Sequence, residues 1–92
     1  MKISSKKKDK ILEQILAYLF SQNPKPIFTA YIALEIARDE EFTKKLLLEL
    51  KQKNLISEIK KNPSGRDYLK RARWKLTEEA YVLYKNIQEV KK

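Results

Sequence analysis

The side chains with the clearest chemical potential in this sequence are basic, and they gather in two stretches. Residues 1–28 carry a net charge of +4 and residues 55–76 carry +5, whereas residues 29–54 and 77–92 are neutral, within an overall charge of +9. Dense lysine and arginine favour a polyanionic partner, either a nucleic acid or an acidic membrane surface. A composition rich in Lys and Glu is also typical of thermophilic proteomes, so the total charge alone does not identify a ligand.

The second basic stretch places three of the four arginines of the chain around one turn. Residues 62–67 hold the only glycine and separate two segments of strand type, 55–61 and 70–76. Arginine at a hairpin tip can follow a phosphate backbone or enter a narrow minor groove. The alternative is a strand edge protected from aggregation by charge, for which fewer charges would suffice. The candidate nucleic-acid contacts in this basic hairpin, residues 60–73, are Lys60, Lys61, Arg66, Lys70, Arg71 and Arg73.

A second group of candidate contacts lies on a predicted helix over residues 42–53. Its inner side is marked by Phe42, Leu46, Leu47 and Leu50. Side chains of the types on its other side reach phosphates or base edges when a helix enters the major groove, although a solvated helix face is an equal alternative. The helix contains no arginine, the usual bidentate reader of guanine. The predicted outward positions are Thr43, Lys44, Lys45, Leu48, Lys51 and Gln52.

Catalytic chemistry has no constellation of residues to support it. The chain has no cysteine and no histidine, so thiolate metal sites, disulfides and imidazole bases are excluded. The serines have no histidine partner, and no glycine-rich phosphate loop is present. We therefore expect no enzyme, no metal, no cofactor and no small-molecule ligand. No apolar stretch approaches the roughly 20 residues that cross a bilayer or resembles a signal peptide, so we expect a cytoplasmic protein without a membrane partner.

The elements that must position these residues follow from hydrophobic periodicity and from turn residues. Pro24 and Pro26 end the first helix, Thr29 is the expected N-cap of the second, and Asn54 is suited to the left-handed position after the third. The predicted elements are helices over 9–22, 29–38 and 42–53, a short strand at 27–28, two hairpin strands, and a last helix that Thr77 caps. Residues 1–8 are expected to form a flexible basic tail, and residues 9–90 one domain.

The last strand has one apolar face, whereas the last helix has two apolar surfaces, which is more than a small monomer requires. Either the core wraps around this helix or a second copy packs against it. Alternation places Ala72, Trp74 and Leu76 on one face of the strand, which favours a core position for Trp74 over a role in base stacking. The predicted inner stripe of the last helix is Ala80, Leu83, Tyr84 and Ile87. The predicted contacts with a second copy lie off that stripe at Tyr81, Val82 and Lys85.

Two local phrases resemble the winged helix-turn-helix superfamily. Leu50-Lys51-Gln52-Lys53-Asn54-Leu55-Ile56 is similar to the segment where the recognition helix passes into the wing, and Trp74-Lys75-Leu76-Thr77-Glu78-Glu79-Ala80 to the segment that closes the wing in PadR-like, MarR-like and small archaeal regulators. Asn54 and Ala80 replace two usual glycines, and the acidic residues 39–41 occupy a turn that more often holds glycine and small polar residues. The resemblance implies an α+β, mostly α fold with a three-helix core, a β-hairpin wing and a C-terminal helix.

The same resemblance implies a function in the nucleoid. It indicates an archaeal transcriptional regulator that binds double-stranded DNA as a homodimer, with helix 42–53 in the major groove and the basic hairpin as the wing. Two alternatives remain open. A protein–protein interaction module of a replication or transcription complex is favoured by the neutral segment 29–54 and by its acidic turn. A non-specific architectural nucleoid protein is favoured by the lysines of the recognition helix.

Overall fold

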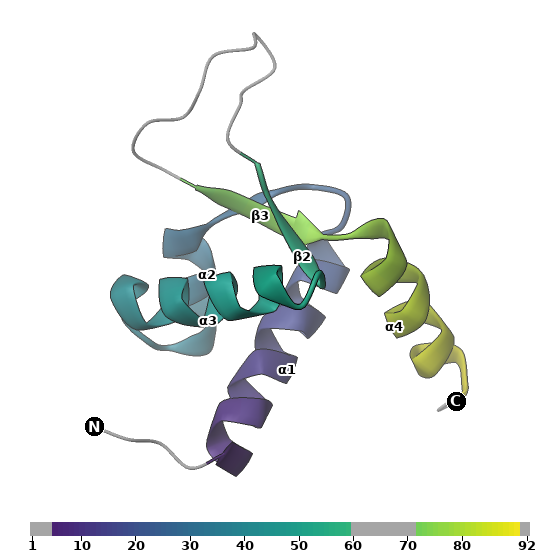
Figure 1. Cartoon of the computed structure of the whole chain (residues 1–92), viewed down its shortest axis with the longest axis horizontal. Coiled ribbons are helices and arrows are strands. Elements are labelled where there is room, and N and C mark those ends of the chain that lie inside the picture. Colours follow the sequence, from purple (N-terminus) through teal and green to yellow (C-terminus); the bar gives the residue numbers. More distant parts are fainter. Residues whose placement is uncertain (1–4, 60–71, 91–92) are drawn as a thin grey trace, which may run out of the picture.

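The structure is a computed structural model that describes residues 5–59 and 72–90, with the side chains of residues 5–87 within those ranges. Figure 1 shows a group of three helices, a small sheet beside them and a fourth helix at one side. In the described part, no helix has both the length and the apolar character needed to cross a membrane. The elements are α1 (Ser5–Gln22), β1 (Ile27–Phe28), α2 (Thr29–Ile36), α3 (Glu40–Gln52), β2 (Ile56–Ile59), β3 (Arg73–Leu76) and α4 (Glu78–Val90).

The turn between α2 and α3 is built from two local signals. Ala37 takes a left-handed conformation with φ 57° and ψ 45°, which ends α2 two residues earlier than predicted. Asp39 then caps α3, because its carboxylate accepts a hydrogen bond of 2.7 Å from the backbone N–H of Phe42. Helix α3 therefore begins at Glu40, two residues before the predicted start at residue 42. Asn54 also takes the predicted left-handed conformation, with φ 64°.

Replacing Ala37 with glycine is expected to stabilise the protein. A left-handed conformation costs an alanine about 1–2 kcal/mol, whereas glycine adopts it freely and loses about 0.5–1 kcal/mol of that advantage to its more flexible unfolded chain. The expected net gain is roughly 0.5–1 kcal/mol, or a few degrees in thermal midpoint by circular dichroism. Ala17→Gly inside α1 is the matched control and should lower the midpoint. A lower midpoint for Ala37→Gly would contradict the prediction.

The sheet has the strand order β1-β3-β2, with both pairings antiparallel. Trp74 is its central residue, because it lies opposite Ile27 on one side and Glu58 on the other. Three helices followed by the β2–β3 hairpin, with β1 as a third strand, make the winged helix-turn-helix arrangement. The predicted fold class, mostly α with a small sheet and a C-terminal helix, is confirmed.

Trp74 occupies the middle of the core, as the alternation of β3 predicts. Its side chain has no exposed surface, and its indole N–H donates a hydrogen bond of 2.8 Å to the hydroxyl of Thr29. Thr29 is the first residue of α2, and its hydroxyl accepts a hydrogen bond from the core residue Trp74. The N-cap position is held by Phe28, whose side chain makes no capping hydrogen bond. The expected capping role of Thr29 is wrong. The surrounding core is formed mainly by Ile11, Ile15, Leu19, Ile32, Leu47, Leu50, Ile56 and Leu76.

Helix α1 begins at Ser5, so the predicted tail of residues 1–8 is too long. One reason is a contact with another element: the Lys8 ammonium lies 2.9 Å from a carboxylate oxygen of Glu49 in α3. The hydrogen bond from Lys8 lowers the pKa of the Glu49 carboxyl below its ordinary value. The contact therefore favours the folded state above the unfolded pKa of glutamate, and this contribution disappears as the pH falls through the lowered value.

Candidate nucleic-acid interface

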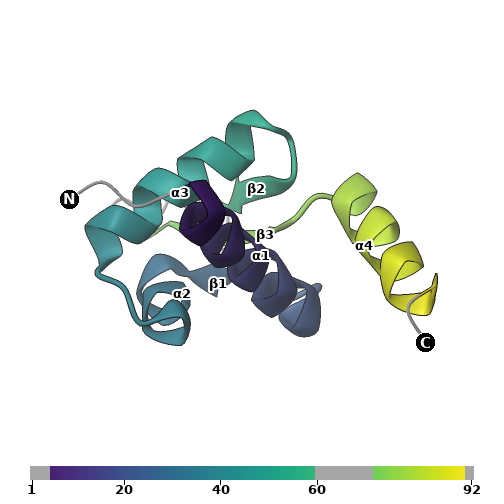
Figure 2. The ribbon, with the colours of Figure 1, turned by 90° about the horizontal axis from the view of Figure 1, so that it is seen from below.

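The outward side of α3 is a continuous exposed surface opposite the core. Thr43, Leu46, Leu47 and Leu50 form the buried side, so the helical period places the remaining positions outward. Figures 1 and 2 show α3 at the edge of the helix group, adjoining β2 through a short turn. We call this exposed side the α3 surface, and its residues are Glu41, Lys44, Lys45, Leu48, Lys51 and Gln52.

Thr43 does not belong to the α3 surface, and the prediction that it faces outward is wrong. Its side chain has no exposed area, and its hydroxyl donates a hydrogen bond of 2.7 Å to the backbone carbonyl of Asp39. The physical reason is the helical period, which puts Thr43 on the same side as Leu46, Leu47 and Leu50. A small polar residue fits that position because the carbonyl at i−4 satisfies its hydroxyl.

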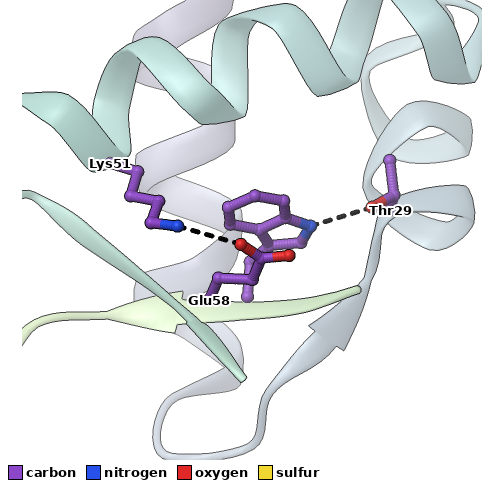
Figure 3. A network of polar contacts seen from close by, with 4 residues as sticks. Thr29, Lys51 and Glu58 are labelled. Atoms are coloured by element: carbon purple, nitrogen blue, oxygen red, sulfur yellow. Dashed lines mark hydrogen bonds and ion pairs between the residues drawn. The ribbon is translucent and has the colours of Figure 1, made fainter. Parts of the chain in front are cut away.

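Lys51 links α3 to the strand that leads into the hairpin. Its ammonium lies 3.0 Å from a carboxylate oxygen of Glu58 in β2, as Figure 3 shows. The contact holds the end of α3 against β2, and it offsets part of the positive charge of Lys51. By contrast, neither Lys44 nor Lys45 has a hydrogen bond or ion pair with another side chain within the described residues. Lys44 and Lys45 are therefore the α3 lysines most available to an external anion.

Most of the basic hairpin, residues 60–71, falls between Ile59 and Ala72 in the chain and lies outside the described residues. The candidate contacts Lys60, Lys61, Arg66, Lys70 and Arg71 lie outside the described residues, so their placement stays a prediction. Arg73 is described, and it is half-buried in β3 with its guanidinium carbon 5.9 Å from the centre of the Phe28 ring. This geometry is a cation–π contact that ties β3 to β1. Arg73 thus contributes to packing at the base of the hairpin.

A hollow of about 500 Å³ opens where α2, α3 and β3 meet. Sequence reasoning did not find it, because its walls come from segments far apart in the chain. Two exposed apolar side chains of α2 were also missed: Tyr31 is 58% exposed and Leu34 is 79% exposed. The signal available in the sequence was that apolar residues lie on more than one side of α2. The hollow is lined by Phe28, Thr29, Ala30, Tyr31, Glu40, Glu41, Lys44 and Ala72.

Helix α4 packs on α1 through aromatic rings, and this changes which of its sides is buried. The ring of Phe20 stacks on Tyr81 at 5.1 Å and contacts Tyr84 at 4.7 Å between centroids. Tyr81 therefore makes an intramolecular contact and is half-buried, which leaves only part of its side chain for the interface predicted there. The prediction that Leu83 and Ile87 point inward is wrong, since they are 61% and 47% exposed.

The outer side of α4 is consequently an apolar surface without a partner in the described part of the chain. Val82 is 50% exposed, and together with Leu83 and Ile87 it defines what we call the α4 face. Lys85, a predicted interface residue, is exposed on the same helix. Figure 2 shows α4 at one side of the molecule, separated from α2 and α3 by α1. The α4 face and the α3 surface are thus different parts of the molecule.

Comparisons with known proteins identify the fold but not a family. No family model matches the sequence, and no curated protein matches it. Among solved structures, Staphylococcus aureus MepR in its DNA-binding conformation superposes with a TM-score of 0.70 at 20% identity, over 87% of this chain and 56% of MepR. The MepR–DNA complex gives 0.69 at 23% identity, over 92% of this chain and 73% of the MepR chain. A candidate DNA-binding protein of Ralstonia eutropha gives 0.68 at 17% identity, over 86% and 95%.

These similarities extend over nearly all of this chain but over only about half of MepR in its DNA-binding conformation. At such identities they establish the winged helix-turn-helix fold. MepR is described as a transcription regulator of the S. aureus multidrug efflux pump MepA.

Proposed function

We propose that this winged helix-turn-helix chain binds double-stranded DNA through the α3 surface and the basic hairpin, and that it regulates transcription. The observation that carries the proposal is the pair Lys44 and Lys45, exposed and free of carboxylate partners within the described residues, on the helix that leads directly into the basic hairpin. The likeness to MepR in complex with DNA supports it. No enzymatic role is proposed. The structural neighbour MepR is described as a transcription regulator.

Binding is expected to be driven mainly by release of counterions from phosphates. Four or more phosphate contacts by lysine and arginine would weaken binding about 100-fold between 50 and 200 mM salt. The test is fluorescence anisotropy of the native chain with a labelled random duplex at these two concentrations. Binding that is absent at 50 mM salt, or that does not weaken with salt, would overturn the proposal.

A protein–protein interaction module is the second candidate, and a specific observation favours it. Tyr31 and Leu34 expose apolar surface on α2 beside the acidic residues of the hollow, which is a suitable anchor for a partner with apolar and basic side chains. Such a module would bind duplex weakly at any salt concentration. An architectural protein, which the arginine-free α3 surface favours, would instead bind unrelated duplexes with nearly equal affinity.

A homodimer through the α4 face completes the proposal. Val82 and Leu83 are apolar and exposed, and beside them lies a hollow of about 610 Å³ that they line together with Asn54, Thr77, Glu78 and Glu79. A second copy would cover this surface and would place two α3 helices in successive major grooves, roughly 34 Å apart. Lys85 stays a predicted interface residue, whereas Tyr81 is replaced by Leu83 and Ile87.

The dimer is tested by the mass of the chain in solution. Light scattering after gel filtration should give twice 11.0 kDa for the native chain and 11.0 kDa for Leu83→Asp. Glu13→Ala, at an exposed position of α1 that does not line this hollow, should leave the mass unchanged. A native chain with a mass of 11.0 kDa at high concentration would overturn the proposal. The cytoplasmic, nucleoid-associated location follows from DNA binding, and an archaeal source stays a prediction because the neighbours named above are bacterial.

A further inference from the structure

The α3 surface contains one residue of the wrong charge for contact with phosphate. Glu41 is exposed at the second position of α3, and it shares a side of the helix with Lys45, Leu48 and Gln52, at spacings of 4, 7 and 11 residues. No hydrogen bond or ion pair engages its carboxylate within the described residues. A free carboxylate therefore lies in line with Lys45, one of the two α3 lysines most available to DNA.

Stabilisation of the helix start does not require a carboxylate at this outward position. Asp39 already caps α3 through its bond to the backbone N–H of Phe42, and Glu40 supplies a further negative charge in the first turn. Glu40 lies about 100° around the helix from Glu41, towards the side of the buried Leu47, although both carboxylates border the hollow beside Phe28. Glu40 and Glu41 thus contribute similarly to the helix terminus but belong to different sides of α3.

We propose that Glu41 is a specificity-determining residue that accepts a hydrogen bond from the 4-amino group of cytosine in the major groove. The proposal rests on the proposed DNA binding. Residues near the N-terminus of a recognition helix are those that reach base edges, and Glu41 is the first residue of the α3 surface. A carboxylate in that position close to phosphates would be repelled, so a donor group on a base is the favourable partner.

The choice of cytosine follows from the donors and acceptors of the four bases. An ionised carboxylate only accepts hydrogen bonds. In the major groove, guanine presents two acceptors, thymine one acceptor, and adenine a donor beside the acceptor N7, whereas cytosine presents its amino donor without an acceptor. Cytosine is therefore the only base whose major-groove edge does not repel either carboxylate oxygen. Lys44 and Lys45, within one turn of Glu41, would take the neighbouring phosphates.

The test compares the duplexes that native and variant chains select from a random library. We expect the native chain to enrich cytosine at one position of the bound site. Glu41→Gln should lose this preference and enrich adenine there, because an amide pairs in bidentate fashion with N6 and N7 of adenine. Glu40→Gln is the matched control: it changes the net charge equally and removes the same first-turn charge, but it should keep cytosine. Both variants should bind random duplex more tightly than the native chain, since each removes a negative charge.

A chemical substitution in the DNA gives a second readout. Replacing the selected cytosine with 2-pyrimidinone, which lacks the amino group, should weaken binding of the native chain roughly tenfold and leave Glu41→Gln nearly unchanged. An unchanged cytosine preference in Glu41→Gln, or an equal loss in Glu40→Gln, would overturn the role of Glu41 while leaving DNA binding intact. A native chain that binds no duplex at 50 mM salt would overturn the proposed function and this inference together.

Discussion

Trp74→Ala is expected to abolish most of the folded population at moderate temperature. The indole is fully buried at the centre of the sheet, and it supports both the base of the hairpin and the start of α2 through Thr29. Truncation of a buried tryptophan costs about 3–5 kcal/mol, because the cavity that remains cannot close completely. Small domains have a total stability of only about 5–15 kcal/mol, so little would remain. Thermal and urea unfolding followed by circular dichroism measure the effect.

Lys75→Ala is the control for Trp74→Ala, since it lies next to Trp74 in β3 and is only half-buried. We expect its urea midpoint to stay close to that of the native chain. Thr29→Val separates the hydrogen bond from the packing: it keeps the volume but leaves the buried indole N–H without its acceptor, at a cost of about 1–3 kcal/mol. A native midpoint for Trp74→Ala would show that the sheet does not depend on this side chain.

The triple change Arg66→Ala, Lys70→Ala and Arg71→Ala is expected to remove most of the affinity for duplex DNA at low salt. If each residue contacts one phosphate, the slope of log affinity against log salt concentration should fall by about 0.9 for each contact. The loss at 50 mM salt should be about 100-fold or more. Arg73 is left in place because its guanidinium packs over the ring of Phe28. Fluorescence anisotropy over a salt series gives both the affinity and the slope.

The matched control for the hairpin variant is the triple change Lys6→Ala, Lys10→Ala and Lys25→Ala. These lysines are exposed and belong to α1 or to the segment after it, and their loss reduces the net charge from +9 by the same three units. We expect a decrease of only a few-fold, because charges that do not contact the duplex act at long range and are screened. Equal losses in the two variants would mean that total charge drives binding, and the hairpin would have no special role.

Whether the sequence alone predicted a structural feature depended on how far apart in the chain the interacting residues lie. Local signals were sufficient for the order of the elements, for the left-handed Asn54 and for the Thr77 cap, whose hydroxyl accepts a hydrogen bond of 3.1 Å from the N–H of Ala80. Each of these depends on residues within a few positions of one another. The alternation in β3 likewise predicted the burial of Trp74 and Leu76 correctly.

The wrong predictions concern residues whose side chains could face either the core or the solvent. Thr43 was assigned to the outside because its side chain is polar, although the helical period places it with the leucines of α3. Leu83 and Ile87 were assigned to the inside because they are apolar. A single helix does not show where its neighbour will be: Phe20 contacts Tyr84, as the predicted stripe allows, but it also contacts Tyr81, which was predicted off that stripe.

The sequence by itself determined the winged helix-turn-helix plan, the concentration of positive charge in the hairpin and the absence of histidine and cysteine chemistry. These properties depend on composition and on short-range patterns. Only the tertiary structure decided which lysines of α3 have no partner among the residues that the structure describes, which side of α4 is exposed, and that Glu41 shares a surface with Lys45. The reason is that these properties depend on contacts between residues distant in the chain, such as Lys51 with Glu58 and Phe20 with Tyr81, which only the packed core brings together.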